Sequence, residues 1–326
     1  MTLGRYVVKR LLQSIPVIFG VATLNFFLIN MLPGSPIQYL VPPGTPPETR
    51  EAYIKLLGLD KPLYERFILY IKGVFTGNFG ISYRYRREVL GIIWSRTPAT
   101  VLLMGSSLIL AIMIAFPLGI LSGKEPGSKK DHTASVFSLI GYSMPAFWLG
   151  LMLIIFLSKV PPYGLGLFPV SGMHDERREY TGAMGYLDVI HHLILPMLTI
   201  TIISIAGFSL FVRSSMIDVI SQDYIMTARA KGLREYAVIH KHALKNALLP
   251  TVTLIGLSVG QILAGAIMTE TVFNWPGLGT LTVEAAFFGD HPILLAFFIL
   301  FAIVVIIVNI LTDVAYALLD PRISYD

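Results

Sequence analysis

Long apolar runs alternate with shorter polar connections along this sequence. A helix needs about 20 predominantly apolar residues to cross a hydrocarbon core about 30 Å thick, and several runs reach that length. The pattern predicts an all-α, polytopic membrane protein with about six transmembrane helices. We expect these spans at residues 11–32, 99–121, 135–157, 193–216, 249–272 and 293–318.

Prolines fall in or near three of the expected spans, at Pro117, Pro145 and Pro196. Each proline lacks a backbone donor and would kink or end a helix in water. In a membrane bundle, neighbouring helices can satisfy the carbonyl groups that proline leaves free. These prolines are therefore compatible with membrane spans.

The N-terminus resembles a secretory signal peptide at first sight, because Arg5, Lys9 and Arg10 precede an apolar run. The run extends from Leu11 to Leu32, which is too long for the apolar region of a signal peptide. No cleavage site of the A-x-A kind follows it. We expect a first span that is retained in the mature protein.

The longest polar stretch, residues 33–98, separates the first two spans. Apolar side chains recur at helical spacing after Pro62: Leu63, Phe67, Tyr70, Ile71 and Val74. This spacing predicts a short amphipathic helix on the outer membrane surface. The alternative is a plain connector, which would be unusually long for a segment without secondary structure.

The amino-acid composition is typical of a protein whose surface is largely covered by lipid. The chain is 54% hydrophobic and only 14% charged, with a mean hydropathy of +0.69, so it has too little polar surface to cover a soluble globule. Its net charge of +5 would suit nucleic acid, but basic residues of membrane proteins mostly lie in cytoplasmic loops. We expect no nucleic-acid partner. The lack of cysteine excludes disulfides and thiolate chemistry.

The distribution of Lys and Arg predicts the orientation. Basic residues gather at the N-terminus, in the connection 122–134 and between the fourth and fifth spans, whereas the short connections on the other side hold only Lys159, Arg177 and Arg178. Segments as long as 33–98 cross largely regardless of charge. We therefore expect both termini in the cytoplasm.

The longest cytoplasmic connection runs from Asp223 to Pro250. Gly232 permits a sharp turn, so the segment would form two helices lying across the membrane face. One face would carry apolar side chains: Ile225, Ala228, Tyr236 and Ile239. Such a basic amphipathic segment could rest on anionic lipid or form a docking surface for a soluble partner.

The same connection contains the motif Met226-Thr-Ala-Arg-Ala-Lys-Gly232, followed by Leu249-Pro250. It resembles the EAA loop of ABC importer permeases, whose general pattern is E-A-A-x-x-x-G and then I-x-L-P. Met226 stands where that pattern has Glu, and the interval to Pro250 is longer than in sugar-type permeases. Both departures resemble the dipeptide and oligopeptide branch, where Y-x-x-T-A-R-A-K-G-L is usual. The resemblance assigns ATPase coupling to Asp223, Tyr224, Thr227, Ala228, Arg229, Lys231, Gly232 and Leu233.

A coupling loop must transmit movement rigidly, so a short helix with small residues on its docking face suits the task. Ala228 and Gly232 would allow this close approach. A bulky residue at Gly232 is expected to uncouple the ATPase while leaving the protein inserted.

Further segments resemble the same branch along nearly the whole chain. They are Leu57-Gly-Leu-Asp-Lys-Pro62, Gly77-Asn-Phe-Gly-Ile-Ser82, Gly141-Tyr-Ser-Met-Pro-Ala-Phe-Trp148, Pro169-Val-Ser-Gly172, Thr269-Glu-Thr-Val-Phe-Asn-Trp-Pro-Gly-Leu-Gly279 and Asp320-Pro-Arg-Ile323. Their order and spacing are similar to the first, or B-type, permease of dipeptide and oligopeptide importers.

The resemblance implies a subunit that transports only within an assembly in the cytoplasmic (inner) membrane of a prokaryote. It would form half of a pore with a second permease, dock on two ATPase subunits that bind ATP and magnesium, and receive peptides from an extracytoplasmic binding protein. No cofactor is expected in this chain. The implied parts are the N-terminus and first helix (1–32), an extracytoplasmic segment (33–98), the core (99–318) with coupling loop 223–250, and a cytoplasmic tail (319–326).

Polar side chains within spans are costly, so they are candidates for the translocation path. Gln261 near the middle of the fifth span is the foremost candidate, with Glu270 and Ser143 as further ones. The segment from Phe273 to Leu281 resembles an outer loop or re-entrant turn near the substrate entrance, and a simple capped turn is the alternative.

Small residues recur in the fifth span at Gly256, Gly260 and Ala264. This small-xxx-small spacing lets helices pack closely. The span could contact the partner permease, line the pore, or pack within its own subunit.

Other classes of function remain to be weighed. The segment from Gly119 to Glu125 departs from a phosphate-binding loop, since Glu125 stands where Ser or Thr would contact magnesium. The adjacent His191 and His192 would point about 100° apart on a helix, which is poor for one metal. We expect no catalytic residue and no metal site. An ATP-independent channel or secondary transporter stays open, as do nickel, glutathione or oligosaccharides as cargo.

Overall fold

The computed structural model describes residues 3–31, 37–41, 44–158, 163–178, 180–262 and 265–319, and its regular elements over these residues are helices. The helices of the first half are α1 (Leu3–Asn30), α2 (Ile37–Leu40), α3 (Pro47–Leu56), α4 (Leu63–Thr76), α5 (Val89–Gly123), α6 (Lys129–Ser143) and α7 (Ala146–Leu157). The helices of the second half are α8 (Ala183–Ile220), α9 (Asp223–Ala230), α10 (Glu235–Ala237), the π-helix η1 (Val238–Ala243), α11 (Leu244–Ala247), α12 (Leu249–Gln261), α13 (Ile267–Val272), α14 (Leu278–Phe287) and α15 (His291–Leu319).

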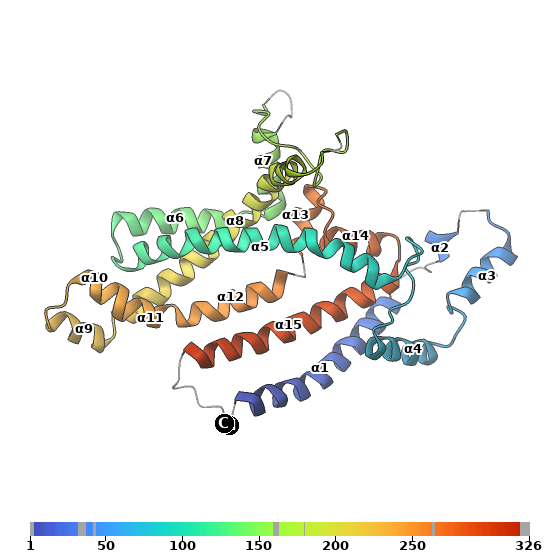
Figure 1. The fold of residues 1–326 in the computed structure, drawn as a ribbon, viewed down its shortest axis with the longest axis horizontal. Helices are drawn as coiled ribbons and strands as arrows, with labels where there is room; N and C mark the ends of the chain where they lie inside the picture. Colours follow the sequence, from blue (N-terminus) through green and yellow to red (C-terminus); the bar gives the residue numbers. More distant parts are fainter. Residues whose placement is uncertain are drawn as a thin grey trace.

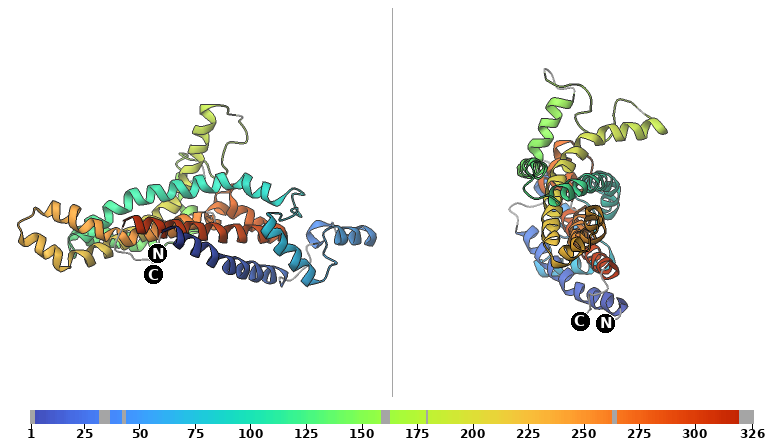
Figure 2. Two further views of the ribbon diagram at one scale, coloured as in Figure 1. Left: turned by 60° about the horizontal axis from the view of Figure 1, so that its bottom comes forward. Right: turned by 90° about the vertical axis from the view of Figure 1, so that its left-hand side faces the viewer.

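Long helices run side by side along the molecule (Figure 1). Helices α9, α10 and α11 lie at one end of the long axis, here called the α9 end, and α3 and α4 lie at the other, the α4 end. Helix α1 begins, and α15 finishes, on the side nearer the α9 end (Figures 1 and 2). Helix α7 and the start of α8 project from the bundle.

Four helices in the described residues are long and apolar enough to cross a membrane: α1, α5, α8 and α15. Up to six spans result if each of two bent helix pairs, α6 with α7 and α10–α11 with α12, makes one crossing. This agrees with the predicted all-α polytopic fold. At 1.5 Å per residue, the 35 residues of α5 and the 38 of α8 exceed the thickness of a hydrocarbon core.

Two predicted spans are not continuous helices. The helix expected over 135–157 is broken between α6 and α7, which meet at 100°. Pro145 cannot continue the hydrogen-bond ladder, and Met144 before it takes an extended conformation with ψ of 127°. The helix expected over 249–272 stops at Gln261, and Gly265 with φ of +72° precedes α13.

Other prolines sit inside unbroken helices, as the membrane setting predicts. Pro117 lies within α5 and Pro196 within α8. These two helices form the most extensive helix pair of the molecule. Their axes approach closely at Gly119 and Gly123, where an added Cβ would stand 2.6 Å from Val212 and Met216 of α8. Only glycine fits at these crossings.

The polar stretch after α1 contains the expected amphipathic helix as α4, which ends at Gly77 with φ of +71°. Its Tyr70 ring stacks on Phe26 of α1 at 5.5 Å. The turn that follows is fixed by Asp290, a buried residue that precedes α15 and accepts hydrogen bonds from the Ser82 hydroxyl and from the backbone N–H of Arg84. The polar stretch is therefore attached to the bundle.

Candidate functional site

The connection between α8 and α12 folds into two helical arms. Helix α9 forms the first arm, and α10, η1 and α11 form the second. Gly232 lies between them with φ of +76°, in the left-handed region that glycine adopts at helix C-termini. Its N–H donates to the Arg229 carbonyl at 2.9 Å, which closes the end of α9. The predicted helix-turn-helix is present.

The inner face of α9 is sealed against the subunit itself. Ile225 is fully buried and Ala228 is 6% exposed. They pack in one apolar cluster with residues of α8, η1 and α11: Val212, Met216, Val238, Ile239, Ala243 and Ala247. Ala228 therefore faces the inside of the subunit, whereas its sequence context predicted a place on the docking face.

Apart from Ala228, the predicted coupling residues are exposed on the two arms. Asp223, Thr227, Lys231 and Gly232 are exposed. Four exposed side chains add apolar or aromatic surface: Tyr224, Met226, Leu233 and Tyr236. We call these four residues the outer-arm patch. Tyr236 differs from expectation, since it is 74% exposed and stacks on His240 rather than joining Ile225 inside.

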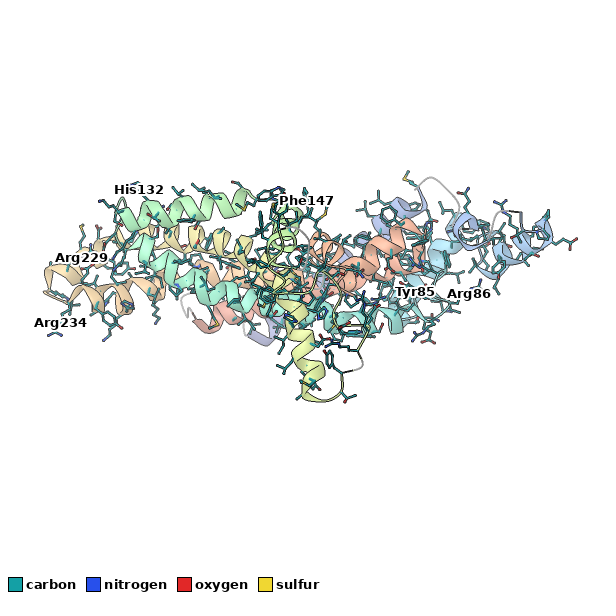
Figure 3. The ribbon with its side chains drawn as sticks, turned by 90° about the horizontal axis from the view of Figure 1, so that it is seen from above. Tyr85, Arg86, His132, Phe147, Arg229 and Arg234 are labelled. Carbon is teal, nitrogen blue, oxygen red and sulfur yellow. The ribbon has the colours of Figure 1, made fainter. Side chains whose placement is uncertain are left out.

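Side-chain contacts hold the two arms in a fixed relation. The Arg229 guanidinium binds the Glu235 carboxylate across the turn, with its two nitrogens at 2.7 and 3.2 Å. Asn246 of α11 donates to the Tyr224 hydroxyl at 2.8 Å. Arg229 and Arg234 lie at the α9 end, far from Tyr85 and Arg86 at the α4 end (Figure 3). The arms thus form a braced surface at one end of the molecule.

A buried ion pair next to the arms escaped the sequence analysis. Asp131 of α6 is 1% exposed and binds Arg213 of α8, whose Nη2 lies 2.8 Å from its Oδ2. The same carboxylate accepts from the Ser122 hydroxyl and from the Gly127 N–H at 2.9 Å. The pair ties the α5–α6 turn to α8. Its sequence signal was Asp131 three residues after the capping residue Ser128.

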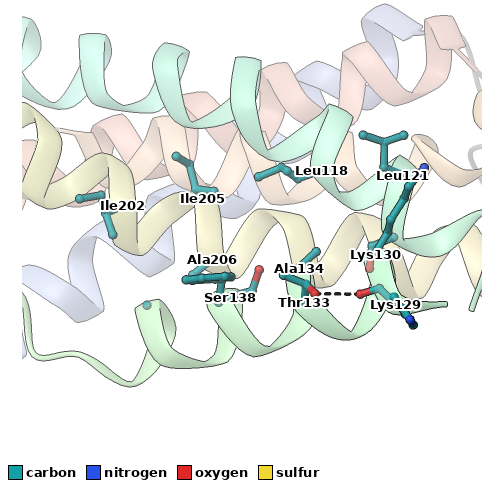
Figure 4. Close-up of a pocket in the computed structure, with 13 residues that line it drawn as sticks. Leu118, Leu121, Lys129, Lys130, Thr133, Ala134, Ser138, Ile202, Ile205 and Ala206 are labelled. Carbon is teal, nitrogen blue, oxygen red and sulfur yellow. Dashed lines mark hydrogen bonds between the residues drawn. The ribbon is translucent and has the colours of Figure 1, made fainter. Parts of the chain in front are cut away.

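An apolar groove of about 720 Å³ lies beside this pair, between α5, α6 and α8 (Figure 4). Leu118, Ile202 and Ile205 line it, and Lys129 and Lys130 mark one end. The groove follows from the close approach of α6 to α8, where an added Cβ at Gly141 would stand 3.3 Å from Ala206.

Glu270, a predicted path residue, is buried at the start of α13. Its Oε1 accepts from the Thr100 hydroxyl of α5 at 2.9 Å, and its Oε2 accepts from the Thr280 N–H of α14 at 3.1 Å. Thr100 in turn accepts from the Leu278 N–H at 2.7 Å. The carboxylate therefore joins three helices, and its oxygens are engaged by the protein in this structure.

The segment after Glu270 forms a buried turn. Trp275 is fully buried and its indole N–H donates to the Ala99 carbonyl at 2.8 Å. A Cβ at Gly277 would overlap the Glu270 carboxylate, so glycine is required there. The place of this turn relative to a substrate entrance stays a prediction.

The other two path candidates are exposed. Ser143, whose hydroxyl donates to the Leu139 carbonyl, ends α6 and lines an open hollow of about 600 Å³ with Phe147 and Trp148. Gln261 is the exposed last residue of α12. The structure does not bring Ser143, Gln261 and Glu270 into one cluster, and their role in translocation stays a prediction.

The small residues of α12 face α15 of the same chain. An added Cβ on Gly256 would overlap the Thr312 side chain, and one on Gly260 would stand 3.7 Å from Val308. Ala264 lies outside the described residues. The sequence Gly256-Leu-Ser-Val-Gly260 has the letters of a G-x-S-x-G nucleophile motif, yet Ser258 sits inside a helix and donates to Leu254.

Two family matches cover most of the chain. Residues 3–104 match the N-terminal part of the membrane component of binding-protein-dependent transport systems. Residues 115–325 match the binding-protein-dependent transport system inner membrane component. The chain belongs to this family. The resemblance to ABC importer permeases is thereby confirmed, and the permease is a non-catalytic membrane component.

The permease is similar over its full length to curated peptide permeases. It is 40% identical to the oligopeptide transport system permease protein AppB of Bacillus subtilis (strain 168), over 99% of this chain and 100% of that protein. It is 39% identical to the dipeptide transport system permease protein DppB of Escherichia coli (strain K12), over 98% and 99%. It is also 38% identical to the glutathione transport system permease protein GsiC of Escherichia coli (strain K12), over 98% and 99%.

A solved structure shares the fold of the permease. A chain of the MetNI methionine ABC transporter, in inward facing conformations, superposes with a TM-score of 0.55. The match covers 71% of the permease and 97% of that chain at 17% identity. At this identity the likeness shows the fold alone.

Proposed function

We propose that the permease forms half of the translocation pore of an ATP-driven importer for dipeptides and oligopeptides. The observation that carries this proposal is identity of 39–40% to two peptide permeases over at least 98% of each chain. A second permease would complete the pore, two ATPase subunits would bind ATP and magnesium, and a binding protein would deliver the peptide. Both termini and the α9 end would face the cytoplasm.

We place the contact with the ATPase on the outer-arm patch. Its support is geometric, because the four side chains project from arms that are packed on α8 and braced by the Arg229–Glu235 pair. Movement of a docked ATPase would therefore be transmitted to α8 and, through Asp131, to α6. The coupling role of Gly232 would be to set the angle between the arms.

Reconstitution tests the proposal. The permease, with the second permease, both ATPases and the binding protein encoded beside it, is placed in proteoliposomes and supplied with a labelled dipeptide. We expect uptake that requires ATP and both permeases. Uptake by the permease alone, or without ATP, would favour a channel or secondary transporter and overturn the proposal.

Glutathione is the second candidate cargo, since a glutathione permease is 38% identical over the same length. Competition separates the two. Unlabelled dipeptide should abolish uptake of the labelled dipeptide at concentrations where glutathione has little effect. The reverse order of potency would assign the permease to glutathione.

A further inference from the structure

A polar hollow at the α4 end of the molecule has no role in the function proposed above. It has a volume of about 580 Å³ and lies between α1, the α3–α4 segment and the start of α15. Figure 1 shows α4 beside the end of α1 there. Phe26, Tyr70 and Leu295 form part of its apolar wall, and the stacked rings of Phe26 and Tyr70 fix α4 on α1.

The charge on this hollow is of one sign. Lys55, Lys61, Arg66 and Lys72 are the Lys, Arg, Asp or Glu residues of its described lining, and the carboxylate of the adjacent Asp290 is engaged by the Ser82 hydroxyl and the Tyr83 N–H. None of the four cations forms an ion pair with a carboxylate in the part of the chain that the structure describes. Four unneutralised cations around one concavity create a positive potential that attracts an anion.

Two groups inside the hollow point to a ligand. Arg66 is half-buried, and its Nη2 donates to the Asn30 side-chain oxygen at 2.7 Å. This bond holds the guanidinium in place and leaves its other N–H groups able to donate to a ligand. The Nδ1 atom of His291 is buried and has no hydrogen-bond partner among the residues that the structure describes. A buried polar atom without a partner costs free energy unless a bound molecule satisfies it.

The hollow opens where apolar side chains are exposed. Leu69 lines it and is 51% exposed, and Ile68 on the same helix is 61% exposed. On α1, Leu24 and Leu28 are 63% and 56% exposed, on the helix face turned away from the lining residues Phe26 and Asn30. Such surfaces on a membrane-spanning helix and an amphipathic helix are covered by lipid. The cations that line the hollow and the exposed apolar side chains of α4 beside it match the charged headgroup and the acyl chains of an anionic phospholipid.

We propose that this hollow binds the phosphate of an anionic phospholipid from the leaflet on the α4 side. Arg66 and Lys72 bind the phosphate, because guanidinium and ammonium groups form charge-assisted hydrogen bonds with phosphate oxygens. The acyl chains lie along Leu69 and Ile68 of α4. The lipid thereby anchors α4, whose own contacts with the bundle include the stacked rings of Tyr70 and Phe26.

Native mass spectrometry of the purified full-length permease tests this site. The protein is titrated with phosphatidylglycerol and, separately, with phosphatidylcholine, and bound lipid is counted. We expect preferential retention of phosphatidylglycerol. The Arg66→Gln/Lys72→Gln variant should weaken its binding about tenfold or more, since each juxtamembrane cation is worth about 1 kcal/mol. Equal binding of both lipids, or no loss in the variant, would overturn the proposal.

Controls separate the lipid from other anions and partners. Inorganic phosphate and glycerol phosphate at millimolar concentration should not displace the lipid, and displacement would show a site for free anions instead. The Arg177→Gln/Arg178→Gln variant removes two exposed cations elsewhere and should keep lipid binding. If the double variant loses the binding protein but not the lipid, the hollow serves a protein partner and the proposal fails. Lys55→Gln/Lys61→Gln provides a second, more exposed variant should the first misfold.

Discussion

Gly232 shows how one residue can fix the geometry of a functional surface. Its φ of +76° favours glycine, but an added Cβ would meet no atom within 4 Å. The constraint is thus on the backbone, and the space outside is free for a partner. A residue that tolerates the left-handed region, such as asparagine, can separate the backbone effect from the effect of bulk.

We expect Gly232→Asn to retain ATP-dependent uptake and Gly232→Trp to lose most of it. The tryptophan adds bulk on the exposed face of the arms, where it would hold the ATPase away, and the protein should still insert because nothing inside the subunit is displaced. Uptake and ATPase activity are measured in proteoliposomes, with membrane content determined by immunoblot. Normal uptake by the tryptophan variant would show that Gly232 does not face the ATPase.

Asp131 carries a second prediction at the residue scale. Removal of one partner of a buried ion pair leaves the other without compensation and typically costs about 3 kcal/mol or more. Asp131→Ala should therefore lower the melting temperature in detergent clearly. Lys130→Ala, at the exposed neighbouring position, should not. An Asp131→Leu/Arg213→Met variant should recover part of the lost melting temperature. An unchanged melting temperature of Asp131→Ala would show that the ion pair does not stabilise the permease.

At the scale of helices, glycines decide which pairs can approach. Gly256 of α12 lies against Thr312 of α15, whereas Gly105 of α5 has no atom within 4 Å of an added Cβ. Both are helical glycines, and alanine is favoured over glycine in a helix by about 1 kcal/mol. The two positions therefore offer a matched comparison of packing against propensity.

Gly256→Ala is expected to destabilise the permease, and Gly105→Ala to be neutral or stabilising. Overpacking of a close contact costs about 1–3 kcal/mol. This cost arises at Gly256, where it outweighs the gain in helix propensity, and does not arise at Gly105. Thermal unfolding followed by tryptophan fluorescence measures both. Thr312→Ala should partly rescue Gly256→Ala, and equal stability of the two single variants would mean that α12 and α15 are less tightly packed.

At the scale of the whole molecule, the arms and the α4 end lie at opposite ends of a set of spanning helices (Figure 1). This separation predicts that the two ends face different compartments. The permease has no cysteine, so a single introduced thiol reports on its own position. Glu51 of α3 and Tyr236 of the outer-arm patch are exposed and suit this purpose.

We expect Glu51→Cys to react with a membrane-impermeant maleimide on intact cells, and Tyr236→Cys to react only after the membrane is opened. The reason is the proposed orientation, with the basic arms held in the cytoplasm. Labelling is followed by gel shift, and the unaltered permease provides the blank. Labelling of Tyr236→Cys on intact cells would reverse the orientation.

The sequence by itself determined where the apolar runs lie, where the basic connection between α8 and α12 lies, and the family. These features depend on local pattern, because span length and the basic character of a loop are properties of contiguous residues. The same local pattern predicted α4 and the helix-turn-helix around Gly232. Pro145 was visible in the sequence too, but whether a proline bends a membrane helix depends on the neighbouring helices. Helix α5 continues through Pro117, whereas the chain bends by 100° between α6 and α7 at Pro145.

Only the tertiary structure decided the direction of side chains and the partners of polar groups. Ala228 faces inward and Tyr236 outward because α8 and η1 cover one side of α9. Glu270 is engaged by Thr100, a residue 170 positions away in the sequence. Contacts at such separations depend on how the helices pack, so residue spacing along one helix could not reveal them.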